Sequence, residues 1–136
     1  MKSTELPSPP RDPLSIDARF RALRGAFYEN LSQDCRNLDL LANQFTLVCE
    51  RGDASVAASS LKEEIRAIAH RIYGAAAIFG AVAVGAAADA LERTVFNTIV
   101  STGTDDRDAS ARILEALANL VSVLAQSRRA VMADFS

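Results

Sequence analysis

Apolar residues recur along nearly the whole chain at intervals of three, four and seven, which is the period of an α-helix that buries one face. No segment of useful length alternates apolar and polar residues as half-buried strands do. The spacing therefore predicts an all-α fold. In the N-terminal third the series consists of Phe20, Leu23, Phe27, Leu31, Leu38, Leu41, Phe45 and Val48.

Helix boundaries are indicated by residues that favour helix starts and stops. Asp12 followed by Pro13 favours a start, and Gly80 and Gly103 favour ends. Gly25 leaves open whether a short first helix is separate from a longer second one. We expect an antiparallel four-helix bundle with a short additional N-terminal helix. The later stripes are Leu61, Ile65, Ile68, Ile72 and Phe79, then Val84, Ala88, Leu91 and Val95, then Ile113, Leu117, Leu120 and Leu124.

Length and composition restrict the number of domains and the classes of function. A chain of 136 residues with 49% hydrophobic residues is expected to form one packed domain. Residues 1–12 hold three of the four prolines and are expected to be a flexible tail, which leaves residues 13–136 as the domain. A net charge of −2 gives no support to nucleic-acid binding. With one histidine, and with Cys35 and Cys49 far apart, we expect no metal site.

The sequence also gives expectations about membranes and location. The first residues carry no apolar stretch typical of a secretory signal. The apolar run "IFGAVAVGAAADAL", residues 78–91, is too short to span a bilayer and is followed by charged residues. We therefore expect a cytoplasmic protein without a membrane segment.

The single histidine, His70, lies about 200° round the helix from Ile68 and Ile72, so it is predicted to face away from the apolar stripe. A glycine within a helix costs roughly 0.5–1 kcal/mol relative to alanine. Gly74, one turn after His70, would leave room for a bulky group on the ring. The remaining neighbours on this face are Glu63, Arg66, Ala67, Tyr73 and Ala77.

The stretch "AHRIYGAAAIFGAVAVGAAADALE", residues 69–92, resembles the signature of histidine phosphotransfer (HPt) domains. The signature has an alanine–histidine pair, then glycine and small residues, an apolar–glycine pair, a second helix and a leucine–glutamate pair. The matching positions are Ala69, His70, Ile72, Gly74, Ala75, Phe79, Gly80, Ala81, Ala88, Leu91 and Glu92.

The resemblance implies that His70 takes a phosphoryl group from an aspartyl phosphate on a receiver domain and passes it to another receiver. It implies that Glu92 holds one ring nitrogen protonated, so that the other can attack. Asp89 lies one turn before Glu92 and could also reach the imidazole. Contacts to the phosphoryl group or the partner are expected from Arg66, Ala67, Arg71, Tyr73, Gly74 and Ala77.

The implied partners are response regulator receivers and a hybrid sensor histidine kinase. Mg²⁺ is expected on the partner receiver, and no cofactor is expected on this chain. No nucleotide-binding motif is visible, so we expect a phosphoryl carrier without kinase activity of its own. We expect the carrier to be a monomer, but the sequence leaves open whether the chain dimerises.

One departure from the family pattern leaves an alternative open. The family usually has lysine at the position of Tyr73, and tyrosine brings a hydroxyl but no positive charge at neutral pH. Arg66 and Arg71 are expected to replace the lysine in part. The alternative is a non-catalytic HPt-like module that docks a receiver or kinase without accepting phosphate.

Overall fold

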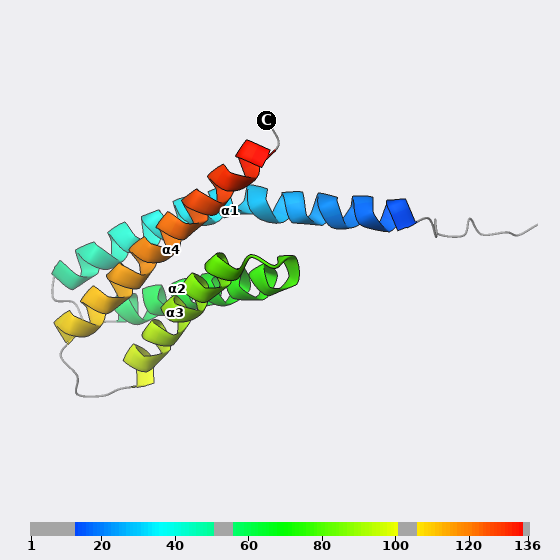
Figure 1. Ribbon diagram of the computed structural model, residues 1–136. Helices are drawn as coiled ribbons and strands as arrows, with labels where there is room; N and C mark the ends of the chain where they lie inside the picture. The colour runs from blue at the N-terminus through cyan, green and yellow to red at the C-terminus, as the bar shows by residue number, and fades with distance from the viewer. Residues whose placement is uncertain (1–12, 51–55, 101–105, 135–136) are drawn as a thin grey trace, which may run out of the picture.

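The computed structural model describes residues 13–50, 56–100 and 106–134, and these residues contain four helices and no strand. The helices are α1 (Pro13–Glu50), α2 (Val56–Phe79), α3 (Val82–Val100) and α4 (Asp106–Asp134). Helices α2 and α3 form a hairpin that lies against the pair α1 and α4 (Figure 1). The all-α bundle expected from the periodicity is confirmed. The predicted tail and the loop around Gly103 lie outside the described residues.

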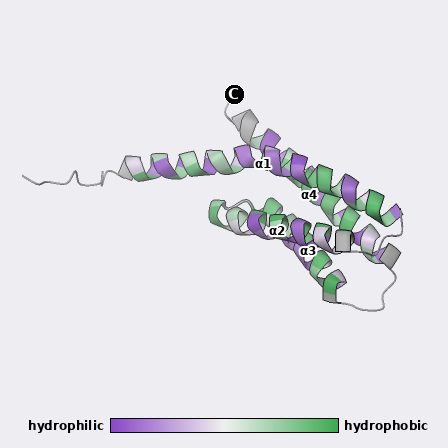
Figure 2. Ribbon diagram, turned by 180° about the vertical axis from the view of Figure 1, so that it is seen from behind, coloured by the Kyte–Doolittle hydropathy of each residue, from purple (hydrophilic) through white to green (hydrophobic). Residues whose placement is uncertain are grey.

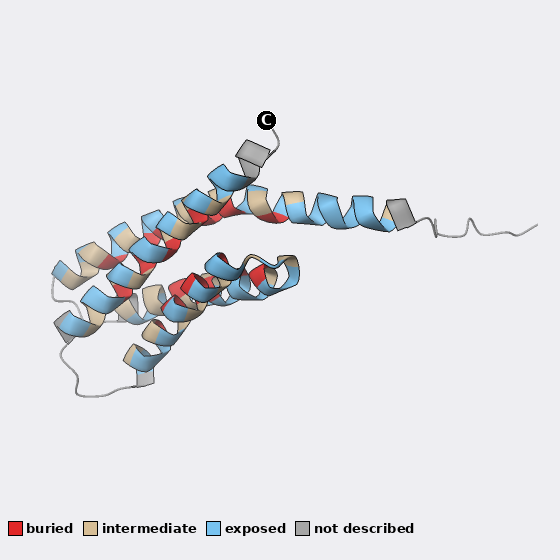
Figure 3. Cartoon of the chain, viewed as in Figure 1, coloured by how far each residue is buried: buried red, intermediate tan, exposed pale blue. Residues whose placement is uncertain are grey.

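The core lies along the inner faces of all four helices, where buried positions line up (Figure 3). The predicted stripes of the last two helices are buried at every position, because each residue recurs on the side that meets the other helices. Burying each of the Val, Leu and Ile side chains in these stripes stabilises the fold by roughly 1.5–3 kcal/mol. The largest fully buried side chains are Phe45, Leu31, Leu38, Ile65, Ile72, Leu91, Ile113, Leu117, Leu120, Leu124, Val84 and Val95.

The turn between α2 and α3 is closed by Gly80, as the sequence predicts. Gly80 has a φ of 69°, a left-handed conformation that favours glycine, and the amide of Ala81 donates to the carbonyl of Ala76 at 2.9 Å. A Cβ on Gly85 would lie 3.5 Å from the Cβ of Ala76, so small residues let the two helices approach closely. This tight hairpin fixes the register between α2 and α3.

Helix α1 runs without a break through Gly25, so the separate N-terminal helix expected from that glycine is wrong. A single helical glycine costs roughly 0.5–1 kcal/mol, which does not interrupt a hydrogen-bond ladder that continues on both sides. The first part of α1 projects past the end of the bundle (Figures 1 and 3). Phe20 and Leu23, expected in the core, are therefore 47% and 61% exposed. Apolar positions continue into this projection (Figure 2).

None of the described helices is both long enough and apolar enough to cross a lipid bilayer.

Candidate functional site

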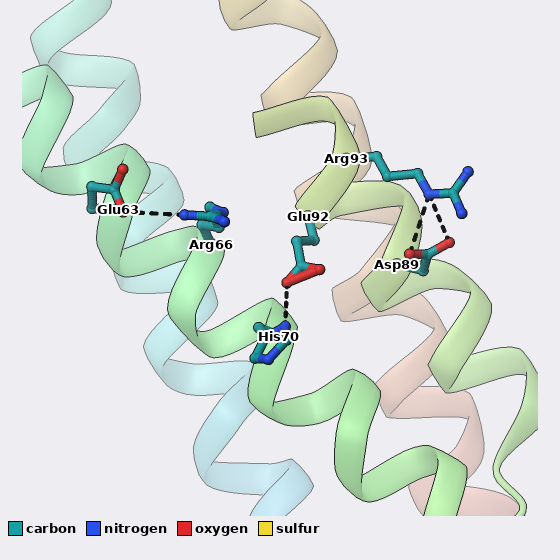
Figure 4. A network of polar contacts seen from close by, with 6 residues as sticks. All are labelled: Glu63, Arg66, His70, Asp89, Glu92 and Arg93. Atoms are coloured by element: carbon teal, nitrogen blue, oxygen red, sulfur yellow. Dashed lines mark hydrogen bonds and ion pairs between the residues drawn. The ribbon is translucent and has the colours of Figure 1, made fainter. Parts of the chain in front are cut away.

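His70 lies in the middle of α2 and points out of the bundle (Figure 4). Its side chain is 75% exposed, whereas Ala69 and Ile72 on either side are buried. The outward direction predicted from the helical angle is thus confirmed. An imidazole in this position is open to a partner molecule.

Glu92 of α3 contacts His70 across the hairpin, with 2.6 Å between Nδ1 and Oε2. An ionised carboxylate can only accept hydrogen bonds, so Nδ1–H donates to it. In the neutral ring the lone pair then lies on Nε2, which no hydrogen bond among the described residues engages. The Glu92 side chain is 21% exposed, and its partial burial strengthens the contact. The register set by the Gly80 turn brings these two residues together, 22 positions apart.

The surface beside the ring is made of small residues. A Cβ added to Gly74 would meet nothing within 4 Å, so the space next to the ring is open. Ala67 and Ala77 are exposed on the same face, and Tyr73 is 43% exposed. These four residues lie where the sequence placed them, around an accessible imidazole.

Arg66 lies one turn before His70 and is held against α3 (Figure 4). Its guanidinium lies 5.4 Å from the centre of the Phe96 ring, and Nη1 is 3.7 Å from Glu63. Its Nε atom is buried and has no hydrogen-bond partner among the described residues. The 3.7 Å pair with an exposed glutamate is weak, because solvent screens it. The Arg66 side chain is 41% exposed, so its Nη atoms, unlike the buried Nε, stay accessible near the His70–Glu92 pair.

A shallow hollow next to Glu92 is lined by Arg66, Asp89, Glu92, Arg93, Phe96 and Asn97. The sequence left open a contact between Asp89 and His70, but the structure shows none. The Asp89 carboxylate instead pairs with Arg93 on the same helix, at 3.1 Å. This ion pair engages the carboxylate within α3.

Arg71 is the candidate contact residue that the structure turns away from His70. Its Nη2 is bound to Oδ1 of Asp34 on α1, at 2.5 Å. Neighbouring residues of a helix point about 100° apart, so His70 meets α3 while Arg71 meets α1. The Arg71 guanidinium thus joins two helices, while its contact with a phosphoryl group or a partner stays a prediction.

Two residues at or near the site were missed in the sequence. Asp34 is 4% exposed and occupies the apolar stripe of α1 between Leu31 and Leu38. A carboxylate in such a stripe needs a buried partner. The position of Asp34 in the stripe could therefore have indicated a buried ion pair. Phe96, one turn after Glu92, carried no comparable signal, because an aromatic residue on a helix is ordinarily read as core. Among the described residues, no group of three or more His, Cys, Asp or Glu is arranged to hold a metal ion.

The fold and the site together define a class: a helical bundle that presents one accessible imidazole, held by a carboxylate of the neighbouring helix. The family model described as Hpt domain matches residues 22–127, and the chain belongs to this family of histidine phosphotransfer domains. It is a histidine phosphotransfer module, and such domains interact with receivers and kinases in phosphorelays. No curated protein and no solved structure matches the chain.

Proposed function

We propose that this protein is a phosphorelay carrier that accepts a phosphoryl group on Nε2 of His70 from a receiver aspartate and passes it to a second receiver. The observation that supports the proposal most directly is the exposed imidazole whose Nδ1 lies 2.6 Å from Glu92. This contact selects the tautomer whose lone pair is on the outward nitrogen. That nitrogen is the only imidazole nucleophile in the chain.

The transfer step balances without any further reactant. The Nε2 lone pair attacks phosphorus, the N–P bond forms, and the P–O bond to the aspartate breaks with its electron pair leaving on the carboxylate. Because Nδ1 keeps its proton, the phosphorylated ring carries a positive charge. The Glu92 carboxylate lies against that charge and stabilises it. The second transfer reverses these steps on another aspartate.

The residues around His70 and Glu92 contribute open space and weak electrostatic contacts. The open surface at Gly74 and Ala67 leaves room for the phosphoryl group and for a receiver that follows it. Mg²⁺ and most of the charge stabilisation would come from the receiver. Arg66 has accessible Nη donors one turn from the ring, whereas Tyr73 offers a hydroxyl in place of the usual lysine. We propose that Arg66 supplies the positive charge that Tyr73 lacks.

The proposal is tested with a phosphorylated receiver, wild-type protein and a His70→Gln variant. Wild-type protein should gain an acid-labile, base-stable phosphoryl group and pass it to a second receiver, and the variant should gain none. Incubation with ATP alone should label neither. Because His70 is exposed, the substitution should leave the helical circular dichroism spectrum unchanged. Label that persists in His70→Gln would show that another residue accepts the phosphate.

The loss of positive charge at Tyr73 favours one competing function, docking without transfer. In that case the receiver would bind equally well to wild-type protein and to His70→Ala, and no phosphorylated receiver would transfer label to either. Binding measured by calorimetry beside the transfer assay separates the two functions.

A further inference from the structure

The projecting part of α1 carries an apolar stripe that nothing in the chain's described residues fully covers. None of residues 15–26 is buried, and Phe27 is the first buried residue after them. Ile16 and Leu23 are 60% and 61% exposed, and Phe20 is covered only in part by Phe79, with ring centres 5.5 Å apart. The projection is about 21 Å long at 1.5 Å per residue. A helix of this length is marginal in water unless its apolar face is packed.

We infer that this stripe is a dimer interface, occupied by the same stripe of a second copy of the chain running antiparallel. Ile16, Phe20, Leu23 and Phe27 follow each other at intervals of four, three and four. This is the spacing of the two apolar positions of a coiled-coil heptad. Antiparallel pairing would stack Phe20 on Leu23, a layer that occurs twice about a two-fold axis. It would also bring Ile16 to the base of the other projection, where Phe27 is already buried against Phe79.

The charges beside the stripe distinguish the antiparallel arrangement from the parallel one. Asp17 and Arg24 occupy the same heptad position on one flank, and Arg19 lies on the other flank. In an antiparallel pair like flanks meet, so Asp17 faces Arg24 of the second copy and the pair occurs twice. In a parallel pair opposite flanks meet, and Arg19 would face Arg24 of the second copy. The charge pattern therefore favours the closed antiparallel dimer.

The end of the bundle adds apolar surface at the place where the second copy's helix tip would arrive. Ile78 and Val82, at the α2–α3 turn, are 69% and 81% exposed. Phe79 between them already contacts Phe27, at 5.2 Å between ring centres, so the turn lies beside the base of the projection. A helix pair of two heptads alone falls below the roughly 1,200 Å² of a standard interface. We therefore expect a dimer that dissociates on dilution.

A receiver is a poorer occupant of the stripe. Phe79 follows His70 by nine positions, which places it about 180° round α2 from the imidazole. The stripe thus packs on the side of α2 opposite the His70 surface, and a receiver seated on His70 would leave it open. The dimer inference does not rest on the proposed phosphotransfer, because the two surfaces are separate.

Sedimentation velocity over a wide concentration range tests the inference. Wild-type protein should form dimers at the highest concentrations, and Leu23→Glu should raise the dissociation constant at least about tenfold. Leu40→Glu is the matched control, since Leu40 is 57% exposed on the same helix but outside the stripe, and it should dimerise as wild type does. Neither variant should change phosphorylation of His70.

Charge reversal tests the orientation. Asp17→Arg and Arg24→Asp should each weaken the dimer, and the double variant should restore it, because the pair reforms with opposite signs. A wild-type chain that stays monomeric throughout, or a double variant no better than the single ones, would overturn the inference. So would a monomer in which Leu23→Glu weakens receiver binding, since the stripe would then belong to a receiver.

Discussion

Two consecutive residues of α2 make the same kind of contact with opposite consequences. His70 pairs with Glu92 of α3, and Arg71 pairs with Asp34 of α1. The Glu92 side chain is 21% exposed, whereas the Asp34 side chain is 6% exposed. The first pair stands at an open surface and the second reaches into the core. Burial of the carboxylate, more than the type of pairing, separates the pair suited to chemistry from the pair that joins helices.

The difference follows from the cost of removing a charge from water. A buried carboxylate without a partner loses its hydration and gains nothing in return, so its pair cannot be opened cheaply. A partly hydrated carboxylate can lose its partner and recover hydrogen bonds from solvent. His70 is therefore free to change its charge during a reaction, whereas Arg71 has to remain in place.

The largest expected effect is on transfer at the open pair. Glu92→Ala should lower the rate of phosphorylation of His70 by about 10- to 100-fold, the range found when the carboxylate that orients a metal-binding histidine is removed. Its free energy of unfolding should change by less than about 0.5 kcal/mol, because the pair is at the surface. The rate is measured by quenched-flow transfer from a phosphorylated receiver.

The matched control for Glu92 is Asp89, on the same helix and 31% exposed in its side chain. Asp89→Ala should transfer at the wild-type rate, because that carboxylate is engaged with Arg93 and not with the imidazole. Equal rates for wild type and Glu92→Ala would contradict the role given to Glu92.

The next effect is on stability at the buried pair. Arg71→Ala leaves the Asp34 carboxylate without its cation and should reduce the free energy of unfolding by about 2 kcal/mol. The value is set below that of a fully buried pair because Arg71 is 56% exposed. Urea denaturation followed by circular dichroism measures it. The transfer rate per folded molecule should not change.

Two further variants sharpen this result. Arg93→Ala removes the cation of an exposed pair and should cost no more than about 0.5 kcal/mol. Asp34→Leu combined with Arg71→Met should recover much of the loss, because two apolar side chains replace two charges. A loss of transfer in folded Arg71→Ala would show that Arg71 takes part in the reaction after all.

The sequence was sufficient for the features that local rules determine. The outward direction of His70 follows from helical angles, and the Gly80 turn follows from the need for a left-handed residue. The partner of Arg71 did not follow, because it depends on how α1 packs against α2. The exposure of Phe20 did not follow either. A repeating apolar stripe shows which face is buried but not where the neighbouring helices end.

A smaller effect on stability is expected at the glycines. Gly74→Ala should stabilise the protein by about 0.5–1 kcal/mol, because the added methyl group meets no atom and the helix favours alanine. Gly80→Ala should destabilise it by about 1 kcal/mol, because alanine is strained at a φ of 69°. Both values are read from thermal or urea unfolding.

The rate of phosphoryl transfer to Gly74 variants tests the open surface of α2 beside His70. Gly74→Ala should still transfer, whereas Gly74→Leu should fold normally and transfer more slowly, because its side chain fills the space beside the ring. Normal transfer by Gly74→Leu would show that the phosphoryl group and the receiver approach from another direction.

The smallest effect concerns Cys35, the neighbour of Asp34 on α1. Burial raises the pKa of the Cys35 thiol, and Asp39 and Asp34 raise it further while Arg128 opposes them. A raised pKa means less thiolate at a given pH, so alkylation of Cys35 should be slower than that of a free thiol and should increase only at higher pH. The Cys49→Ser variant isolates this rate. Alkylation at neutral pH as fast as that of free cysteine would contradict the raised pKa of the Cys35 thiol and the burial that causes it.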